Sequence, residues 1–250
     1  VQTELSLEDL EAIGDVPRDL NGVYLRNGPN RRFEAPGRYH MFDGDGMLHA
    51  AHFDRGRVTY RNKWVRTDAW LEEERAGGSP FWGIMSTLKG RRDLRLKDSA
   101  NTDVIAHAGH AVASWYMAGE AYHVDPVTLE TLGKADYVKG LGNGFSAHPK
   151  VDEHSGEMMF FDYWHEQPFM SHGVVNAEGR LTHHEPIELP GARLPHDMAI
   201  TEHYSILHDL PLFHDDEAYR AGRHKLCFHS ELPTRFGVLP RYGAGSEIRW

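Results

Sequence analysis

Hydrophobic residues along this chain fall in short runs that glycine, proline, aspartate and asparagine separate. The runs are roughly four to eight residues long and rich in valine, tyrosine, phenylalanine and tryptophan, a pattern that favours strands over helices. Helical periodicity is weak, and it predicts helices only at Ser6–Ala12 and Asp68–Arg75. The sequence therefore predicts an all-β fold, with strands at Gly22–Arg26, Val58–Val65, Val104–Ala108, Ala111–Tyr116, Ala121–Val124, Met158–Tyr163 and Ala199–Leu207.

A loose internal repeat supports this prediction. Four segments each run from an apolar residue through Asp or Asn and a short turn into the next strand: FDRGRV (53–58), VDPVTLETLG (124–133), VDEHSGEM (151–158) and VNAEGRL (175–181). Asp and Asn suit such turns because their side chains bond the nearby backbone. Strand pairs joined in this way fit either the blades of a propeller or the hairpins of a sandwich.

Composition narrows the class of protein. Acidic residues outnumber basic ones by 37 to 27, for a net charge of −10, which disfavours binding to nucleic acid. No apolar run approaches the roughly 18 residues of a membrane-spanning helix, and the acidic N-terminal segment is unlike a signal peptide. A single cysteine, Cys227, excludes an internal disulfide framework. We therefore expect a soluble, cytoplasmic protein.

Histidine is the residue type that stands out, with 18 in the chain. Several close pairs have no recognised metal-ligand spacing, and ordinary surface or strand-edge roles are favoured for them: His49/His52, His107/His110, His183/His184 and His203/His208. His148 and His196 differ, because each follows a turn and enters a strand. Their wide separation fits equivalent positions on two sheets that point to a common axis. Spacing alone leaves both a shared metal and ordinary roles open.

Several motifs, in order along nearly the whole chain, give a more specific indication. They are RNGPN (26–30), YHMFDGDGMLH (39–49), NTDV (101–104), VDPVTLETLG (124–133), AHPKVD (147–152), HDMAIT (196–201) and FGVLPR (236–241). Together they resemble the carotenoid cleavage oxygenase family, which includes apocarotenoid, lignostilbene and isoeugenol dioxygenases and a retinoid isomerase.

The resemblance implies a seven-bladed β-propeller with one Fe(II) on its axis, held by four histidines. His148 and His196 are similar to the first two iron ligands, and Thr102 to a threonine whose methyl group crowds an open iron position. Imidazole is a suitable ligand for ferrous iron. The implied reaction is oxidative cleavage of a conjugated C=C bond with O₂, which gives two carbonyl products.

Two departures from the family pattern affect these expectations. The family is roughly twice as long, so residues 1–250 are expected to form a single propeller domain that is truncated on its C-terminal side. The chain then covers about the N-terminal half of the propeller, and the third and fourth ligands lie outside it. The family also carries a glutamate that orients an iron-bound histidine. Met117 stands at the aligned position, and Glu120 replaces that glutamate only if the register shifts.

The substrate is predicted from residues that differ within the family. Its stilbene- and phenylpropene-cleaving members grip a phenol with a Tyr and a Lys, and the aligned positions here are Met85 and Tyr116. With Phe145 they predict an apolar, aromatic pocket that suits a polyene. An apocarotenoid is the preferred substrate, and a phenolic alkene derived from lignin is the alternative.

Other interpretations stay open at this point. SPFWGIM (79–85) has the composition of a loop that docks on a bilayer surface, which predicts peripheral membrane contact. A propeller hydrolase with a divalent cation would enlist Asp43, Asp45 and Asp103. A propeller without a metal would bind a polyene and leave it intact.

Overall fold

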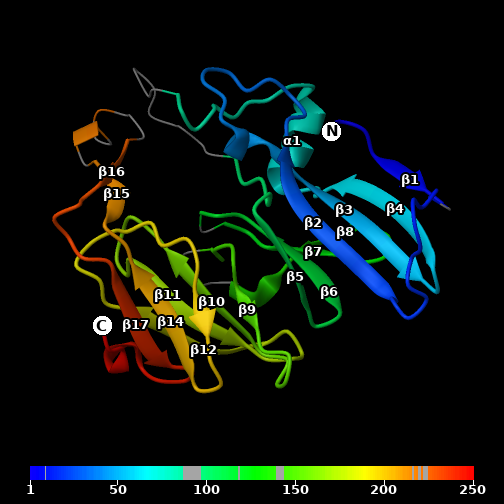
Figure 1. Cartoon of the computed structure of the whole chain (residues 1–250). Helices are drawn as coiled ribbons and strands as arrows, with labels where there is room; N and C mark the ends of the chain where they lie inside the picture. The colour runs from blue at the N-terminus through cyan, green and yellow to red at the C-terminus, as the bar shows by residue number, and fades with distance from the viewer. Residues whose placement is uncertain are drawn as a thin grey trace.

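The structure is a computed structural model, and it describes residues 1–8, 10–86, 97–117, 119–138, 144–215, 217–218, 221 and 225–250. Within these residues the strands form three four-stranded sheets, one three-stranded sheet and one two-stranded ribbon, and the paired strands are antiparallel. The sheets follow one another in chain order (Figure 1). This confirms the prediction of an all-β fold.

The first two sheets account for the N-terminal half of the chain. The first sheet has the order β1-β4-β3-β2 and the second β5-β6-β7-β8. The bounds in the first sheet are β1 Leu5–Leu7, β2 Gly22–Asn30, β3 Asp45–Asp54 and β4 Arg57–Trp64. Those in the second are β5 Asp103–His107, β6 His110–Ser114, β7 Tyr122–Val124 and β8 Thr131–Lys134.

The remaining strands form the third sheet, in the order β12-β11-β10-β9, the fourth, in the order β13-β14-β17, and the ribbon of β15 and β16. Their bounds are β9 Lys150–Val151, β10 Met158–Tyr163, β11 Met170–Val175, β12 Leu181–Ile187, β13 Ala199–Ile200, β14 Tyr204–Asp209, β15 Leu212–His214, β16 Leu226–Phe228 and β17 Arg235–Pro240. Among the helical elements whose bounds the structure describes are α1 Asp68–Ala76 and the short 3₁₀ turns η1 Met41–Asp43, η2 Asp136–Val138 and η3 Gly245–Glu247.

The four repeated segments of the sequence are the turns between adjacent strands. They join β3 to β4, β7 to β8, β9 to β10 and β11 to β12. In the last of these, the side chain of Asn176 accepts hydrogen bonds from the backbone of Glu178 and Arg180, and Gly179 has a φ of 79°. The side-chain bond to the local backbone expected of Asp and Asn is therefore present.

Two predictions of secondary structure are wrong. Ser6–Ala12 is not a helix, because Leu5–Leu7 pairs with β4 and the side chain of Asn62 bonds the backbone of Leu5 and Thr3. These tertiary contacts outweigh a weak helical pattern. Ala199–Leu207 is not one strand either, since a turn separates β13 from β14.

Three hydrophobic clusters lie between consecutive sheets, and a smaller one lies between the first sheet and α1. Leu48 of the first sheet packs with Ala113 of the second. Val112, next to Ala113 on the same strand, faces the other way and packs with Phe160 of the third sheet. Phe161 in turn packs with residues of the fourth sheet. Because side chains alternate between the faces of a strand, β6 and β10 each bury both faces, as blades of a propeller do.

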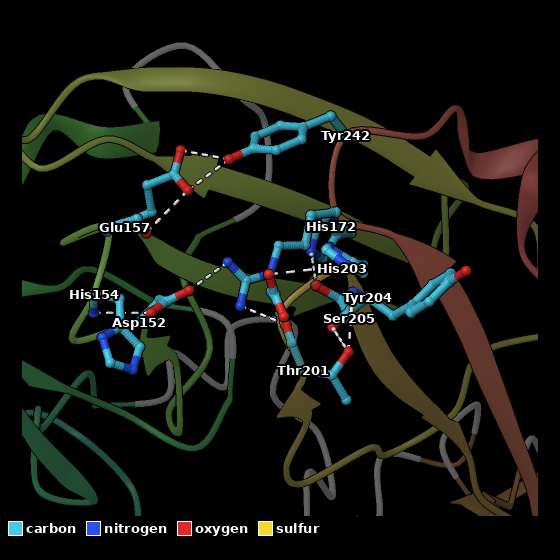
Figure 2. A network of polar contacts seen from close by, with 12 residues as sticks. Asp152, His154, Glu157, His172, Thr201, His203, Tyr204, Ser205 and Tyr242 are labelled. Carbon is cyan, nitrogen blue, oxygen red and sulfur yellow. Dashed lines mark hydrogen bonds and ion pairs between the residues drawn. The ribbon is translucent and has the colours of Figure 1, made fainter.

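Polar contacts also join the third and fourth sheets. Arg241, after β17, donates to Asp152 Oδ2 at 2.6 Å, and its Nε donates to the Thr201 carbonyl at 2.8 Å (Figure 2). Nearby, His172 Nε2 lies 2.9 Å from Ser205 Oγ, and both side chains are fully buried. The two sheets are thus held together by a guanidinium clamp as well as by the core.

Candidate metal centre

His148 follows a segment, residues 145–147, that hydrogen bonds hold between the second and third sheets. The amides of Phe145 and Ala147 donate to the carbonyls of Gly119 and Trp115, both at 2.8 Å, and Ser146 N donates to the Phe161 carbonyl at 3.2 Å. His148 itself has a φ of 64°, in the left-handed region that side chains other than glycine seldom adopt. This conformation turns the chain directly before β9 and sets the direction in which the imidazole leaves it.

His196 lies before the first strand of a different sheet. It precedes β13, and the next residue, Asp197, accepts a hydrogen bond from Met198 N at 2.8 Å. The imidazoles of His196 and His148 meet with ring centroids 4.9 Å apart and planes at 65°. The predicted convergence of these two histidines is therefore present.

This spacing fits two ligands of one metal ion. An ion about 2.1 Å from an imidazole nitrogen lies about 3.2 Å from the ring centre, so rings at 90° around it have centres about 4.5 Å apart and rings at the tetrahedral angle about 5.2 Å. The observed 4.9 Å lies between these values. Imidazole nitrogen also suits Fe(II). In the described residues no three His, Cys, Asp or Glu side chains form a metal-holding group, so this centre comprises two candidate ligands.

The NTDV segment lies against this pair, and two asparagines hold it there. Asn27 of the RNGPN motif donates to the carbonyls of Ala100 and Asp103, at 2.8 and 3.0 Å. Asn101 donates to the carbonyls of Phe42 and Gly44, at 2.9 and 2.6 Å. Two of the motifs found in the sequence thus position a third.

Asp103 is a site residue that the metal hypothesis did not assign. Its Oδ2 lies 3.2 Å from His148 Nδ1. Burial raises the pKa of the Asp103 carboxyl, but the hydrogen bond and charge of His148 outweigh this effect and the net shift is downward. The pKa of His196 is lowered, first by burial and then by repulsion from His148. The electrostatics therefore favour an ionised Asp103 and a neutral His196, and a neutral imidazole is the form that binds a metal.

Thr102 has its hydroxyl fully engaged. Its Oγ1 accepts from Tyr116 N at 3.0 Å and donates to Asn101 Oδ1 at 3.1 Å. The side chain is fixed by these bonds, which leaves the methyl group as its unbonded part. Its neighbour in the chain, Asp103, contacts His148.

Tyr116 is largely buried, and its ring lies 5.2 Å from that of Phe42. Burial and the nearby charge of Asp43 raise the pKa of its phenol, so the phenol stays neutral. Phe42 is 45% exposed and was missed because it reads as part of a glycine-rich turn. Met85 is 46% exposed on a loop in which Ile84 N donates to Asp43 Oδ1.

Phe145 needs a correction. Its side chain is fully buried and stacks on Phe160, with ring centroids 5.1 Å apart, in the cluster between the second and third sheets. A side chain without exposed surface has no face for a substrate, so the structure places Phe145 in the core. Glu120 does not replace the missing glutamate at Met117, because it pairs with Lys134 at 3.1 Å.

Members of two of the other histidine pairs bond nearby side chains, and two of the acidic groups have partners of their own. His49 Nδ1 lies 2.6 Å from the Tyr60 hydroxyl, and His184 Nε2 lies 2.8 Å from Ser171 Oγ. Asp43 accepts backbone hydrogen bonds from His40 and Ile84, while Asp45 pairs with Lys97. The carboxylates of a divalent-cation hydrolase are therefore not assembled among these residues.

Comparison with known proteins adds to this geometry. The model of the retinal pigment epithelial membrane protein (RPE65) family matches residues 1–250. The chain belongs to this family. Among curated members of the RPE65 family, the chain is 38% identical to a carotenoid 9,10(9',10')-cleavage dioxygenase of Crocus sativus, over 97% of this chain and 48% of that protein. It is 35% identical to an isoeugenol monooxygenase of Pseudomonas nitroreducens, over 99% of this chain and 53% of that protein.

Solved structures of the RPE65 family share the fold. The lignostilbene dioxygenase of Pseudomonas brassicacearum superposes with a TM-score of 0.85 at 30% identity, covering 100% of this chain and 53% of that one. A variant of the Synechocystis apocarotenoid oxygenase superposes with a TM-score of 0.82 at 28% identity, covering 99% of this chain and 55% of that one. The chain spans about half the length of these relatives. Among its described helices, none is long and apolar enough to cross a membrane.

Proposed function

We propose that this chain is part of an Fe(II)-dependent dioxygenase that cleaves a conjugated C=C bond of an apocarotenoid to two carbonyl products. The observation that carries the proposal is the approach of the His148 and His196 rings to 4.9 Å. The family, with relatives named as carotenoid cleavage dioxygenases, supports the reaction class.

The roles of the residues follow from their contacts. His148 and His196 bind the iron through neutral imidazoles, and iron supplies the activation of O₂ when it is bound. The hydroxyl of Thr102 is occupied by its own hydrogen bonds, so we assign its methyl group, not its hydroxyl, to the surroundings of the metal. Tyr116 and Phe42 offer aromatic surface for a conjugated chain. The polypeptide therefore binds the metal, positions the alkene and limits the access of water.

The alternative substrate is a stilbene or phenylpropene with a free phenol. It is favoured by the similarity to isoeugenol monooxygenase and to lignostilbene dioxygenase. Against it, the positions assigned to the phenol-gripping Tyr and Lys carry Met85 and Tyr116, so this pocket has no ammonium there. We therefore prefer the apocarotenoid.

The test uses the complete protein. Anaerobically purified protein is expected to bind one iron per chain and, after O₂ is admitted, to form aldehyde from an apocarotenal faster than from isoeugenol or a hydroxylated stilbene. His148→Ala and His196→Ala are expected to lose the iron and keep the fold, as measured by metal analysis and circular dichroism. His203→Ala, which removes an exposed imidazole, is the matched control. Undiminished iron in both site variants would contradict the ligand assignment, and exclusive cleavage of the phenolic alkenes would contradict the substrate.

Peripheral membrane contact through residues 79–85 is also part of the proposal. Apolar substrates of this class partition into bilayers, and Met85 is exposed on this loop. Co-sedimentation with liposomes, lost in Met85→Ser, is the expected result. Complete protein that stays in the supernatant at every liposome concentration would rule this contact out.

A further inference from the structure

Asp103 of the NTDV segment contacts the histidine pair. Its Oδ2 lies 3.2 Å from Nδ1 of His148. We propose that Asp103 is a positioning residue that keeps the Nδ1 of His148 protonated and turns its Nε2 towards the metal. This inference rests on the proposed function, because it assigns a partner to one of the proposed ligands.

The carboxylate of Asp103 is fixed by its own strand. Oδ1 accepts a hydrogen bond from Val104 N at 2.8 Å, at the beginning of β5. The Asp103 carbonyl accepts from Asn27 at 3.0 Å, which ties the residue to the first sheet. Oδ1 and the backbone of Asp103 are thus both hydrogen-bonded, and the second carboxylate oxygen is directed at His148.

An imidazole needs such a partner to act as a ligand. A neutral ring has one nitrogen that carries the proton and one with a free lone pair, and the bond made by the first decides which nitrogen faces the metal. A carboxylate on Nδ1–H selects the tautomer with its lone pair on Nε2 and makes that nitrogen more basic. It also sets a negative charge close to a cation that neutral imidazoles leave uncompensated.

The neighbouring acid does not have this role. Asp197 follows His196 directly, but its Oδ1 accepts from Lys150 at 2.5 Å and from Met198 N at 2.8 Å. Its charge is thereby largely compensated by the lysine. Of the two carboxylates beside the pair, Asp103 is the one in contact with an imidazole.

The experiment measures metal binding without substrate. Complete protein is titrated anaerobically with Co²⁺, which is used as a spectroscopic probe, and the affinity and ligand-field absorption are recorded for wild type, Asp103→Ala and Asp103→Asn. Removal of an outer-shell partner lowers metal affinity by about 10–100-fold, and this range is expected for Asp103→Ala together with a changed absorption spectrum. The Co²⁺ affinity of Asp103→Asn is expected to lie between those of wild type and Asp103→Ala, because the amide oxygen still accepts from Nδ1–H of His148 but carries no charge. Asp54→Asn, an exposed residue at the end of β3, is the matched control.

The outcomes separate the two levels of the proposal. Wild type that binds Co²⁺, with an Asp103→Ala variant of the same affinity and spectrum, would overturn the role of Asp103 and leave the proposed function standing. Wild type that binds neither Co²⁺ nor Fe²⁺ would overturn both. A purely structural role for Asp103 predicts a lower melting temperature with an unchanged Co²⁺ spectrum in the folded variant, and this result would also overturn the inference.

Discussion

The ammonium of Lys150 lies 2.5 Å from Asp197 Oδ1 and 3.1 Å from the carbonyl of His148. One side chain therefore ties the segment that carries His148 to the segment that carries His196. The two imidazoles come from different sheets, so their spacing depends on a link of this kind as well as on packing between the sheets.

Substitution of Lys150 is expected to weaken metal binding more than folding. The pair with Asp197 is partly exposed, and such pairs contribute about 0.2–1 kcal/mol, which corresponds to a loss of up to about fivefold in metal affinity for Lys150→Met. Asp197→Asn and the double variant complete a double-mutant cycle measured by anaerobic Co²⁺ titration. Lys134→Met, which removes a surface ion pair elsewhere, is the control. Strictly additive effects of the two substitutions would show that the pair is not coupled.

Lys97 is expected to be the charge whose loss costs the most stability where β3 packs against α1. Its ammonium lies 2.7 Å from Asp45 and 2.6 Å from Glu73, and all three side chains are buried. Burial raises the pKa of Asp45 to about 6 although Lys97 acts in the opposite direction. Lys97→Met leaves two carboxylates without a cation, and breaking a buried pair costs about 3–5 kcal/mol. Urea denaturation measures the loss, and Lys63→Met, beside the exposed Glu130, should lose less than about 1 kcal/mol.

The contacts of Arg241 are expected to depend on the planar shape of its guanidinium group. It bonds Asp152 and the Thr201 carbonyl at once (Figure 2), which a lysine ammonium does not reproduce. Arg241→Lys is predicted to lower the free energy of unfolding by about 1.5–3 kcal/mol, the range for hydrogen bonds of a charged group. The exposed Arg249→Lys serves as the comparison. Equal melting temperatures of the two variants would show that the contacts of Arg241 with Asp152 and Thr201 add nothing to the stability.

His172 makes the stability depend on pH. Burial, reinforced by His183 and His184, lowers its pKa to about 3, far below the value of 6.5 for an unperturbed histidine. Between these values the unfolded chain binds a proton that the folded chain does not. The stability that the neutral ring provides is therefore complete above pH 6.5 and is lost as the pH falls towards 3, by about 1.4 kcal/mol per pH unit.

Replacement of His172 by Asn is expected to flatten this dependence. Free energies of unfolding at pH 5, 6 and 7 give the slope for each protein, and His203→Asn, at an exposed imidazole, is the control. The free energy of unfolding of His172→Asn should change less steeply with pH than that of wild type, by the equivalent of up to one bound proton. An unchanged slope would mean that other groups cause the acid sensitivity.

The hairpins followed from local patterns and the histidine pair from the family resemblance, whereas the contacts that connect them did not. Asp-turn-strand segments specify hairpins because turn and strand are encoded within about ten residues. Contacts such as Asp103 with His148 depend on which sheets become neighbours, and no local signal carries that information. Phe145 was assigned to the substrate because an aromatic residue in an irregular segment has no periodicity to show which side is buried. Ser6–Ala12 likewise does not form the predicted helix, because part of it pairs with β4.

The side-chain NH₂ groups of Asn27 and Asn101 donate to backbone carbonyls. The scaffold around the histidines is thus specified without any side chain that a substrate would have to match. A change of an exposed apolar side chain such as Met85 is therefore expected to leave these amide contacts, and the frame that holds the imidazoles, unchanged.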